Sequence, residues 1–206
     1  SGYSDNKIIE YFENRFYVSH QKALLALNVS KAEREILLTN SPLDVSLYIG
    51  IPFCPTRCLY CSFTSYPIDK YSKKADEYIN KLAEELKFVS GKLKGRRLRS
   101  VYIGGGTPTS LNDGQFAKLM ENVSEIFDLQ NVDEFTVEAG RPDTITKAKL
   151  EAMKKAGVNR ISVNPQTMNQ KTLDIIGRRH SVEDIKKAFY MAKEEGFNNI
   201  NMDIIL

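Results

Sequence analysis

The chain has 206 residues and a formal net charge of +3, with 42% hydrophobic and 27% charged residues. This length and composition predict one globular domain or a tight pair of domains, and so small a charge gives no reason to expect a nucleic-acid partner. No apolar stretch reaches the ~18 residues of a membrane-spanning helix. The polar N-terminus has no signal-peptide pattern, so we expect a cytoplasmic protein.

Residues 1–42 are predicted to form a helical N-terminal segment. Apolar residues recur at helical spacing between positions 8 and 16, and Ser30 with Glu33 has the pattern of a capping box at the start of a helix. The stretch NSPLD (40–44) contains turn-forming residues and is expected to end this segment.

Strand and helix patterns alternate over residues 43–206, which we expect to form the core domain. Strand patterns occupy 45–51, 100–105, 134–139, 158–164 and 200–206, and helical patterns occupy 71–90, 113–127, 144–157 and 181–196. This alternation predicts a parallel sheet covered by helices, as a barrel or an open sheet, with the functional residues at the C-terminal ends of the strands. Because the fifth strand ends without a turn, we expect a domain that is truncated there.

All three cysteines lie within eight residues, in the loop after the first strand. Cys54, Cys58 and Cys61 have the spacing C-x3-C-x2-C. Thiolates favour zinc, copper(I) or iron–sulfur clusters. Structural zinc needs a fourth protein ligand, and His180 could supply it only if the chain folds back toward the cysteines. A further alternative is that the three thiols are buried and purely structural. A [4Fe–4S] cluster held by only three cysteines would leave one iron open.

The stretch CPTRCLYC (54–61) resembles the signature of the radical S-adenosylmethionine (SAM) superfamily. Further stretches are similar to the oxygen-independent coproporphyrinogen III oxidase family: VYIGGGTPTSL (101–111), FTVEAGRP (135–142), NPQTMNQKTLDIIGRRH (164–180) and NMDIIL (201–206). The resemblance implies a partial (β/α)6 barrel. It also implies a [4Fe–4S] cluster on Cys54, Cys58 and Cys61, whose open iron chelates SAM, and reductive cleavage of SAM to a 5′-deoxyadenosyl radical.

The same resemblance implies the residues that contact SAM. They are Tyr48, Tyr60, Gly105, Gly106, Thr107, Glu138, Gln166, Arg178 and Asp203. The residues by themselves leave simpler alternatives open. The glycine run is compatible with a tight turn, Glu138 with a salt bridge at the rim of the barrel, and the two tyrosines with core positions. A buried Asp203 needs a partner, such as Arg178 or a ligand hydroxyl.

The function implied by the resemblance is a radical SAM oxidoreductase of anaerobic haem biosynthesis. Such an enzyme decarboxylates propionates of coproporphyrinogen III to give protoporphyrinogen IX, and draws electrons from a reduced donor such as flavodoxin or ferredoxin. NPQTMN (164–169) is similar to the coproporphyrinogen dehydrogenase branch. The alternative is a haem chaperone-like protein without oxidase activity, because CSF (61–63) lacks the further cysteine of the oxidase branch. We expect the truncated chain itself to be inactive.

Overall fold

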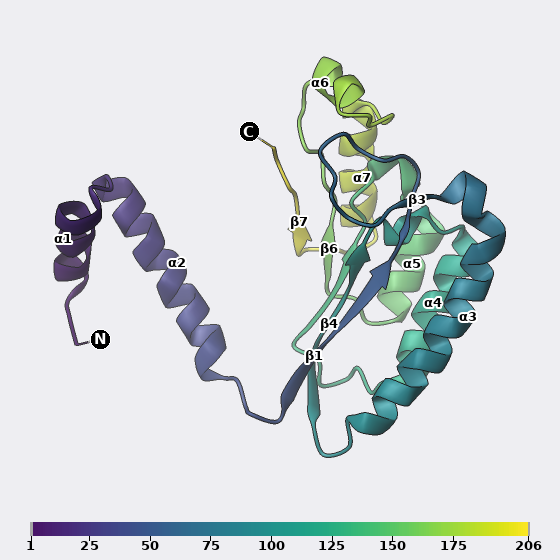
Figure 1. Ribbon diagram of the computed structural model, residues 1–206, viewed down its shortest axis with the longest axis horizontal. Coiled ribbons are helices and arrows are strands. Elements are labelled where there is room, and N and C mark those ends of the chain that lie inside the picture. The colour runs from purple at the N-terminus through teal and green to yellow at the C-terminus, as the bar shows by residue number, and fades with distance from the viewer. Residues whose placement is uncertain (1, 206) are drawn as a thin grey trace. The chain divides into compact units, whose positions relative to one another are not determined.

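The computed structural model describes residues 2–205 (Figure 1). The chain divides into two compact units, residues 1–44 and 45–206. None of the helices formed by residues 2–205 has the length and apolar character that crossing a membrane requires.

The first unit consists of two helices, α1 (Asp5–Phe16) and α2 (His20–Leu38). They pack through the buried side chains of Ile9, Ala23 and Leu27. Helix α2 is continuous and begins after Ser19, so the predicted helix start at Ser30 is wrong. The residues before Ser30 include good helix formers and no proline or glycine, so nothing interrupts the helix there.

The second unit contains a sheet of five strands in the order β1-β4-β5-β6-β7. The strands are β1 (Asp44–Ile51), β4 (Arg97–Gly105), β5 (Glu134–Glu138), β6 (Arg160–Ser162) and β7 (Ile200–Asn201). The pairs from β4 to β7 are parallel, with Val137 opposite Ile161 and Ile161 opposite Ile200. The sheet is not closed among the described residues. The predicted α/β partial barrel is therefore confirmed.

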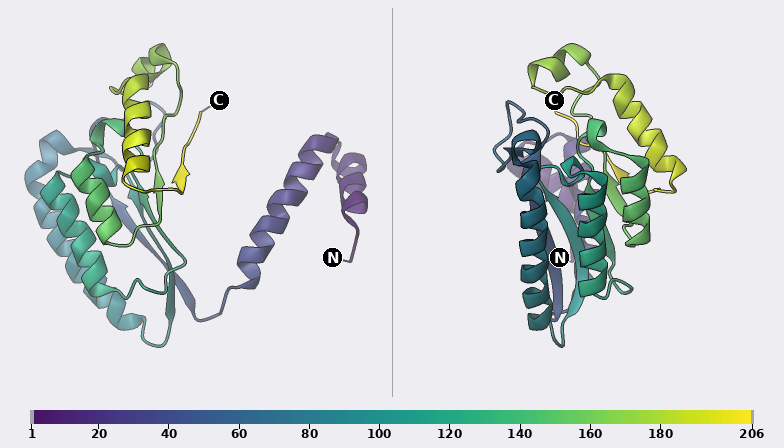
Figure 2. Two further views of the ribbon diagram at one scale, coloured as in Figure 1. Left: turned by 180° about the vertical axis from the view of Figure 1, so that it is seen from behind. Right: turned by 90° about the vertical axis from the view of Figure 1, so that its right-hand side faces the viewer.

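Helices cover one face of this sheet (Figures 1 and 2). They are α3 (Ile68–Lys92), α4 (Asp113–Ile126), α5 (Lys147–Lys155) and α7 (Val182–Glu194). The predicted cap Asn112 forms a capping box with Gln115, which fixes the start of α4. Each helix therefore begins just after the connection that leaves the C-terminal end of a strand.

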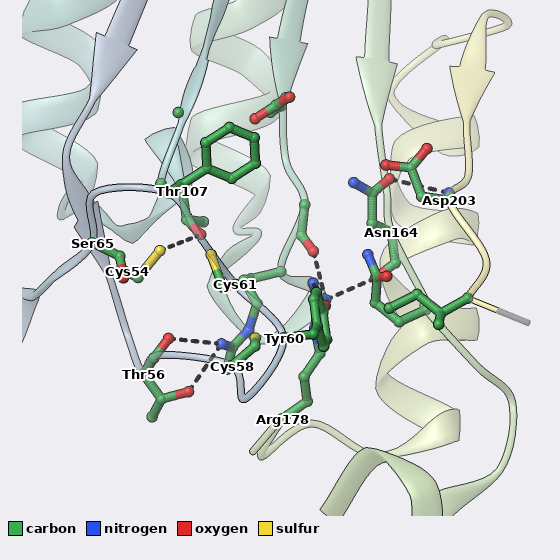
Figure 3. Close-up of a pocket in the computed structure, with 18 residues that line it drawn as sticks. Cys54, Thr56, Cys58, Tyr60, Cys61, Ser65, Thr107, Asn164, Arg178 and Asp203 are labelled. Carbon is green, nitrogen blue, oxygen red and sulfur yellow. Dashed lines mark hydrogen bonds between the residues drawn. The ribbon is translucent and has the colours of Figure 1, made fainter. Parts of the chain in front are cut away.

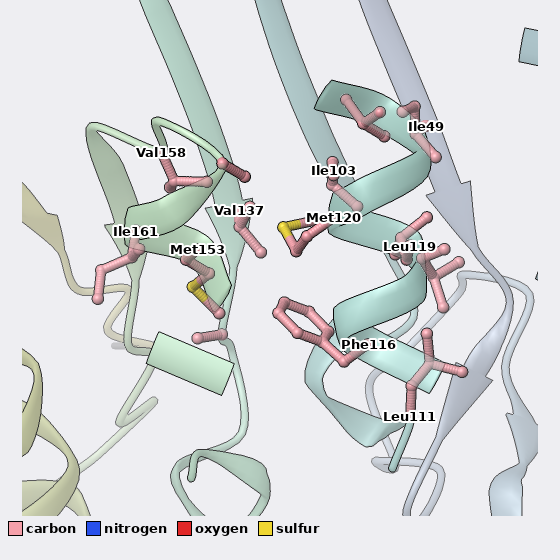
Figure 4. Packing of buried hydrophobic residues seen from close by; sticks show 14 of the residues in the cluster. Ile49, Ile103, Leu111, Phe116, Leu119, Met120, Val137, Met153, Val158 and Ile161 are labelled. Atoms are coloured by element: carbon pink, nitrogen blue, oxygen red, sulfur yellow. The ribbon is translucent and has the colours of Figure 1, made fainter. Parts of the chain in front are cut away.

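The core lies between the sheet and the helices. Alternate strand residues such as Ile103 and Val137 are fully buried against Phe116, Leu119 and other side chains of the helices (Figure 4). Burying a side chain of this size stabilises the fold by about 1.5–3 kcal/mol. The other residues of each strand face away from the helices, toward the open side of the sheet.

Short elements form the connections at the C-terminal ends of the strands. They are β2 (Phe53–Cys54), β3 (Tyr66–Pro67), η1 (Pro108–Ser110), η2 (Pro142–Thr144) and α6 (Gln170–Ile175). Strands β2 and β3 pair in parallel, and the cysteine loop joins them.

The last predicted strands are shorter than the sequence suggested. Only Ile200–Asn201 form β7, followed by an isolated bridge between Gln166 and Ile204. Gln166 has a φ of 64°, which a regular strand does not accommodate. Its amide donates to the carbonyl of Asp203 at 3.0 Å. The chain there leaves the sheet ladder and instead borders a pocket.

Candidate functional site

A pocket of about 360 Å³ lies at the C-terminal ends of the strands (Figure 3). Its volume is typical of a small-molecule site. Its lining includes all the predicted site residues except Tyr48: Cys54, Cys58, Tyr60, Cys61, Gly105, Gly106, Thr107, Glu138, Gln166, Arg178 and Asp203. The structure therefore brings together residues from four strand ends and from the cysteine loop.

The three cysteines are free thiols on one side of this pocket. Cys54 is buried, and its Sγ lies 3.3 Å from Thr107 Oγ1. Burial raises the pKa of the Cys54 thiol, while the hydroxyl of Thr107 and the charge of Arg141 act in the opposite direction. The Cys61 amide donates to the Cys58 carbonyl at 3.1 Å, which curls the loop between them.

The chemistry of the donor set suits an iron–sulfur cluster, because the three free thiols are soft ligands. Among residues 2–205, no three histidine, cysteine or acidic side chains converge as they would around one ion. His180 does not line the pocket and lies beside Asp143, with Nδ1 3.5 Å from Oδ1. Among the described residues, the histidine suggested as a fourth zinc ligand is therefore not placed beside the thiols.

The glycines after β4 allow a close backbone contact. Gly105 has a φ of 102°, and a Cβ on Gly106 would lie 2.6 Å from the Phe53 carbonyl oxygen and 3.1 Å from Cys54 Sγ. The amides of Gly106 and Thr107 donate to the carbonyls of Ile51 and Phe53, each at 2.7 Å. The turn after β4 is thus docked directly on the strand that leads into the cysteine loop.

Glu138 ends β5 and accepts a hydrogen bond from the Tyr102 hydroxyl. Burial raises the pKa of Glu138, and the nearby Asp203 carboxylate raises it further. The hydrogen bonds from the Tyr102 hydroxyl and the Gly105 backbone act in the opposite direction. Tyr48 stacks on Tyr102, with ring centroids 5.8 Å apart and an interplanar angle of 11°. Tyr48 does not line the pocket, and its ring stacks on Tyr102 instead. Strand alternation could have found Tyr102, because it faces the same side as Glu138.

Arg178 is buried and holds several loops together. Its Nη1 donates to the carbonyls of Gly140 at 2.8 Å and Asn164 at 2.9 Å, and its Nη2 donates to the Tyr60 hydroxyl at 3.2 Å. Its Nε has no hydrogen-bond partner among the described residues. Asp203 accepts a hydrogen bond from Asn201 at 2.8 Å. Asp203 is exposed and lies beyond the end of β7, so the expectation of a buried carboxylate is wrong. Arg178 and Asp203 have other partners than the pairing that the sequence suggested.

Several pocket residues were not found from the sequence. They are Thr56, Phe63, Ser65, Gly140, Arg141, Asn164 and Ile205. Arg141 is 2% exposed, and it contacts both Thr56 and Asp143. Its position three residues after Glu138, in a strand-end connection, was the available signal.

The family model described as the Radical SAM superfamily matches residues 48–206. The chain belongs to this superfamily. Radical SAM proteins use a [4Fe–4S] cluster and SAM, and the pocket presents three free thiols on one loop. The resemblance seen in the sequence is confirmed.

The comparisons also find radical SAM relatives that are named for haem metabolism. The oxygen-independent coproporphyrinogen-III oxidase-like protein HemZ of Bacillus subtilis (strain 168) is 43% identical over 79% of this chain and 33% of its own length. The heme chaperone HemW of the same organism is 42% identical over 78% of this chain and 42% of its own length.

A solved structure supports the same relationship. The coproporphyrinogen III oxidase HemN from Escherichia coli, described as a radical SAM enzyme, matches with a TM-score of 0.69 and 31% identity over 77% of this chain and 36% of that chain. The chain thus spans between a third and somewhat over two fifths of the length of these relatives.

Proposed function

We propose that Cys54, Cys58 and Cys61 hold a [4Fe–4S] cluster and that the adjoining pocket binds SAM. The observation that carries this proposal is that the three thiols and the strand-end residues line one pocket. When bound, the cluster supplies the electron that cleaves SAM reductively. A reduced donor such as flavodoxin or ferredoxin would deliver that electron in the cytoplasm.

The pocket residues offer complementary groups for SAM. The Glu138 carboxylate suits its ammonium group, and the partnerless Nε of Arg178 suits a carboxylate or hydroxyl. Gly105 and Gly106 line the same pocket, and their backbone would contact the methionyl part. Tyr60, whose hydroxyl is held by Arg178, presents its ring to the pocket and suits the adenine. The protein would thus position the cofactor, and the cofactor would supply the difficult chemistry.

For the whole protein, the substrate we propose is coproporphyrinogen III. Each reacting propionate would give up one hydrogen atom, one carbon dioxide and one further electron to an external acceptor, and become a vinyl group. Support comes from HemZ, a coproporphyrinogen-III oxidase-like protein, and HemN, a coproporphyrinogen III oxidase, both of which match this chain at above 30% identity. Positioning of the propionate beside the radical source would decide which carbon reacts.

A haem chaperone is the second candidate. HemW of Bacillus subtilis is almost as similar as HemZ, at 42% identity. The residues after Cys61 are Ser62 and Phe63, without a further cysteine. A chaperone would keep the cluster and bind haem without converting a porphyrinogen.

One preparation tests these proposals. The full natural protein, reconstituted anaerobically with iron and sulfide, should be brown, Cys58→Ala should lose the colour, and Ser62→Ala in the same loop should keep it. Incubation with SAM, a reductant and coproporphyrinogen III should then yield protoporphyrinogen IX. Haem binding without this product would favour the chaperone, and a colourless wild type would contradict cluster binding.

A further inference from the structure

The cysteine loop is held by two buried arginines, one for each interval between cysteines. Arg178 donates to the hydroxyl of Tyr60, which lies between Cys58 and Cys61. Arg141 donates through Nη1 to Thr56 Oγ1 at 3.0 Å, and Thr56 lies between Cys54 and Cys58. The loop itself buries little apolar surface, since Leu59 is 78% exposed and Phe63 64% exposed. Polar contacts therefore carry much of its conformation.

Arg141 is itself held rigidly. Its Nε and Nη2 each donate to one carboxylate oxygen of Asp143 at 3.1 Å, in a bidentate pair. Burial alone would raise the pKa of Asp143, but the neighbouring His180 ring and the Arg141 guanidinium hold that pKa well below its usual range. The carboxylate is thus ionised at neutral pH and fixes the plane of the guanidinium, so that Nη1 points at the loop.

Thr56 connects the loop to a second site. Its hydroxyl accepts from Arg141 and donates to the carbonyl of Gly177 at 3.0 Å. The Leu59 amide donates to the Ile176 carbonyl at 3.1 Å. The loop is therefore attached both to the connection after β5, which carries Arg141, and to the end of α6.

We propose that Arg141 is a positioning residue that holds the cysteine loop in the shape that receives the cluster, before the cluster binds. Asp143 orients Arg141, and Thr56 transmits its position to Cys54 and Cys58. This inference rests on the proposed cluster at the three cysteines. Preorganisation of this kind removes the ordering cost from the binding step. If Arg141 only contributed to general stability, its replacement would speed hydrogen exchange throughout the sheet. If it positions the loop, its replacement would speed exchange in the loop alone.

The first test uses the cluster-free protein and hydrogen exchange. Arg141→Lys keeps the charge and loses the planar fork, so exchange at the Leu59 amide should become about tenfold faster, the factor that corresponds to ~1.4 kcal/mol. Thr56→Val should act in the same way, and Thr56→Ser should restore the wild-type rate. The double variant Arg141→Lys/Thr56→Val should exchange no faster than the stronger single variant, because each single variant already removes the Arg141–Thr56 hydrogen bond.

Arg160→Lys is the matched control. Arg160 also pairs with a carboxylate, Glu134, with its Nη1 3.2 Å from Oε1, but it lies at the opposite end of its strand from the pocket. Its replacement should leave Leu59 exchange unchanged. An unchanged Leu59 rate in Arg141→Lys would overturn the proposal, and so would an equal rise at the β4 amides of Val101 and Ile103.

The second test uses the reconstituted protein. Iron release to a chelator under anaerobic conditions should be about tenfold faster in Arg141→Lys than in the wild type, and Thr56→Ser should release iron at the wild-type rate. Equal release from Arg141→Lys and wild type would overturn the proposal. If the wild type retains no iron, the proposed cluster fails, while the exchange rates still decide whether Arg141 orders the loop.

Discussion

The carboxylate of Glu138 lies half-buried at the end of β5, where burial raises its pKa and the Asp203 carboxylate adds to the shift. A raised pKa means that the folded protein holds this proton more tightly than the unfolded chain. The free energy of unfolding therefore falls as the pH rises from the ordinary carboxyl pKa, about 4.3, to the raised pKa of Glu138 in the folded protein. Above that raised pKa the contribution of the bound proton to stability is fully lost. Glu138 thus costs stability at neutral pH in a position where we propose that it binds a cation.

Glu138→Gln should raise the melting temperature at pH 7, because the amide removes the buried charge and still accepts from Tyr102. The difference from the wild type should shrink as the pH falls toward about 4, where the wild-type carboxyl is protonated. Calorimetry across this range measures both effects. In the same variant, SAM should bind more weakly, since the ammonium group loses its counter-ion.

Glu134→Gln provides the comparison on the same strand. Glu134 accepts from Thr136 at 2.8 Å and pairs with Arg160 at 3.2 Å, so removing its charge breaks favourable contacts. This variant should gain no stability at pH 7. A Glu138→Gln protein that is equally or less stable than the wild type would show that the buried charge is better compensated than its surroundings indicate.

At the scale of elements, the turn after β4 determines how the cysteine loop meets the sheet. Gly106→Ala would place a Cβ 2.6 Å from the Phe53 carbonyl oxygen and 2.9 Å from that of Ile51. Backbone atoms of two paired segments cannot move aside easily, so we expect a loss of ~1–3 kcal/mol in the free energy of unfolding, as for other overpacked sites. Urea denaturation measures this loss.

Gly114→Ala is the control for that substitution. Gly114 lies in the first turn of α4, and the nearest atom to its added Cβ is Asn112 Oδ1 at 3.5 Å. Alanine is favoured over glycine in helices by about 0.5–1 kcal/mol, so this variant should be at least as stable as the wild type. Equal effects of the two substitutions would contradict the close packing of the β4 turn.

Much of the element order was predictable from the sequence, because strand and helix periodicities are local properties. The strand containing Val101 and the helix capped by Asn112 appear where expected. The short β7 and the left-handed Gln166 were not predictable, since they depend on hydrogen bonds between segments far apart in the chain. Arg141 was missed for the same reason: its partner Thr56 lies 85 positions away.

The whole molecule combines units of very different core size. The unit from residue 45 onward buries the strands against four helices through a continuous apolar cluster. The unit of residues 1–44 has a cluster with three buried side chains, Ile9, Ala23 and Leu27. A core that small rarely stabilises a fold of about 40 residues without further contacts. The pocket and all its lining residues belong to the larger unit.

These cores predict different behaviour when the chain is divided. A protein of residues 43–206 retains β1 and the complete apolar cluster, so it should unfold cooperatively, within about 5 °C of the full chain's melting temperature, since a loss of ~1 kcal/mol corresponds to about 2–4 °C at this size. A peptide of residues 1–44 should show weak helicity and no cooperative transition, because three buried side chains form too small a core to hold its two helices together. Circular dichroism on both pieces measures this. Loss of cooperative unfolding in residues 43–206 would mean that the N-terminal helices are part of the fold that presents the cysteines.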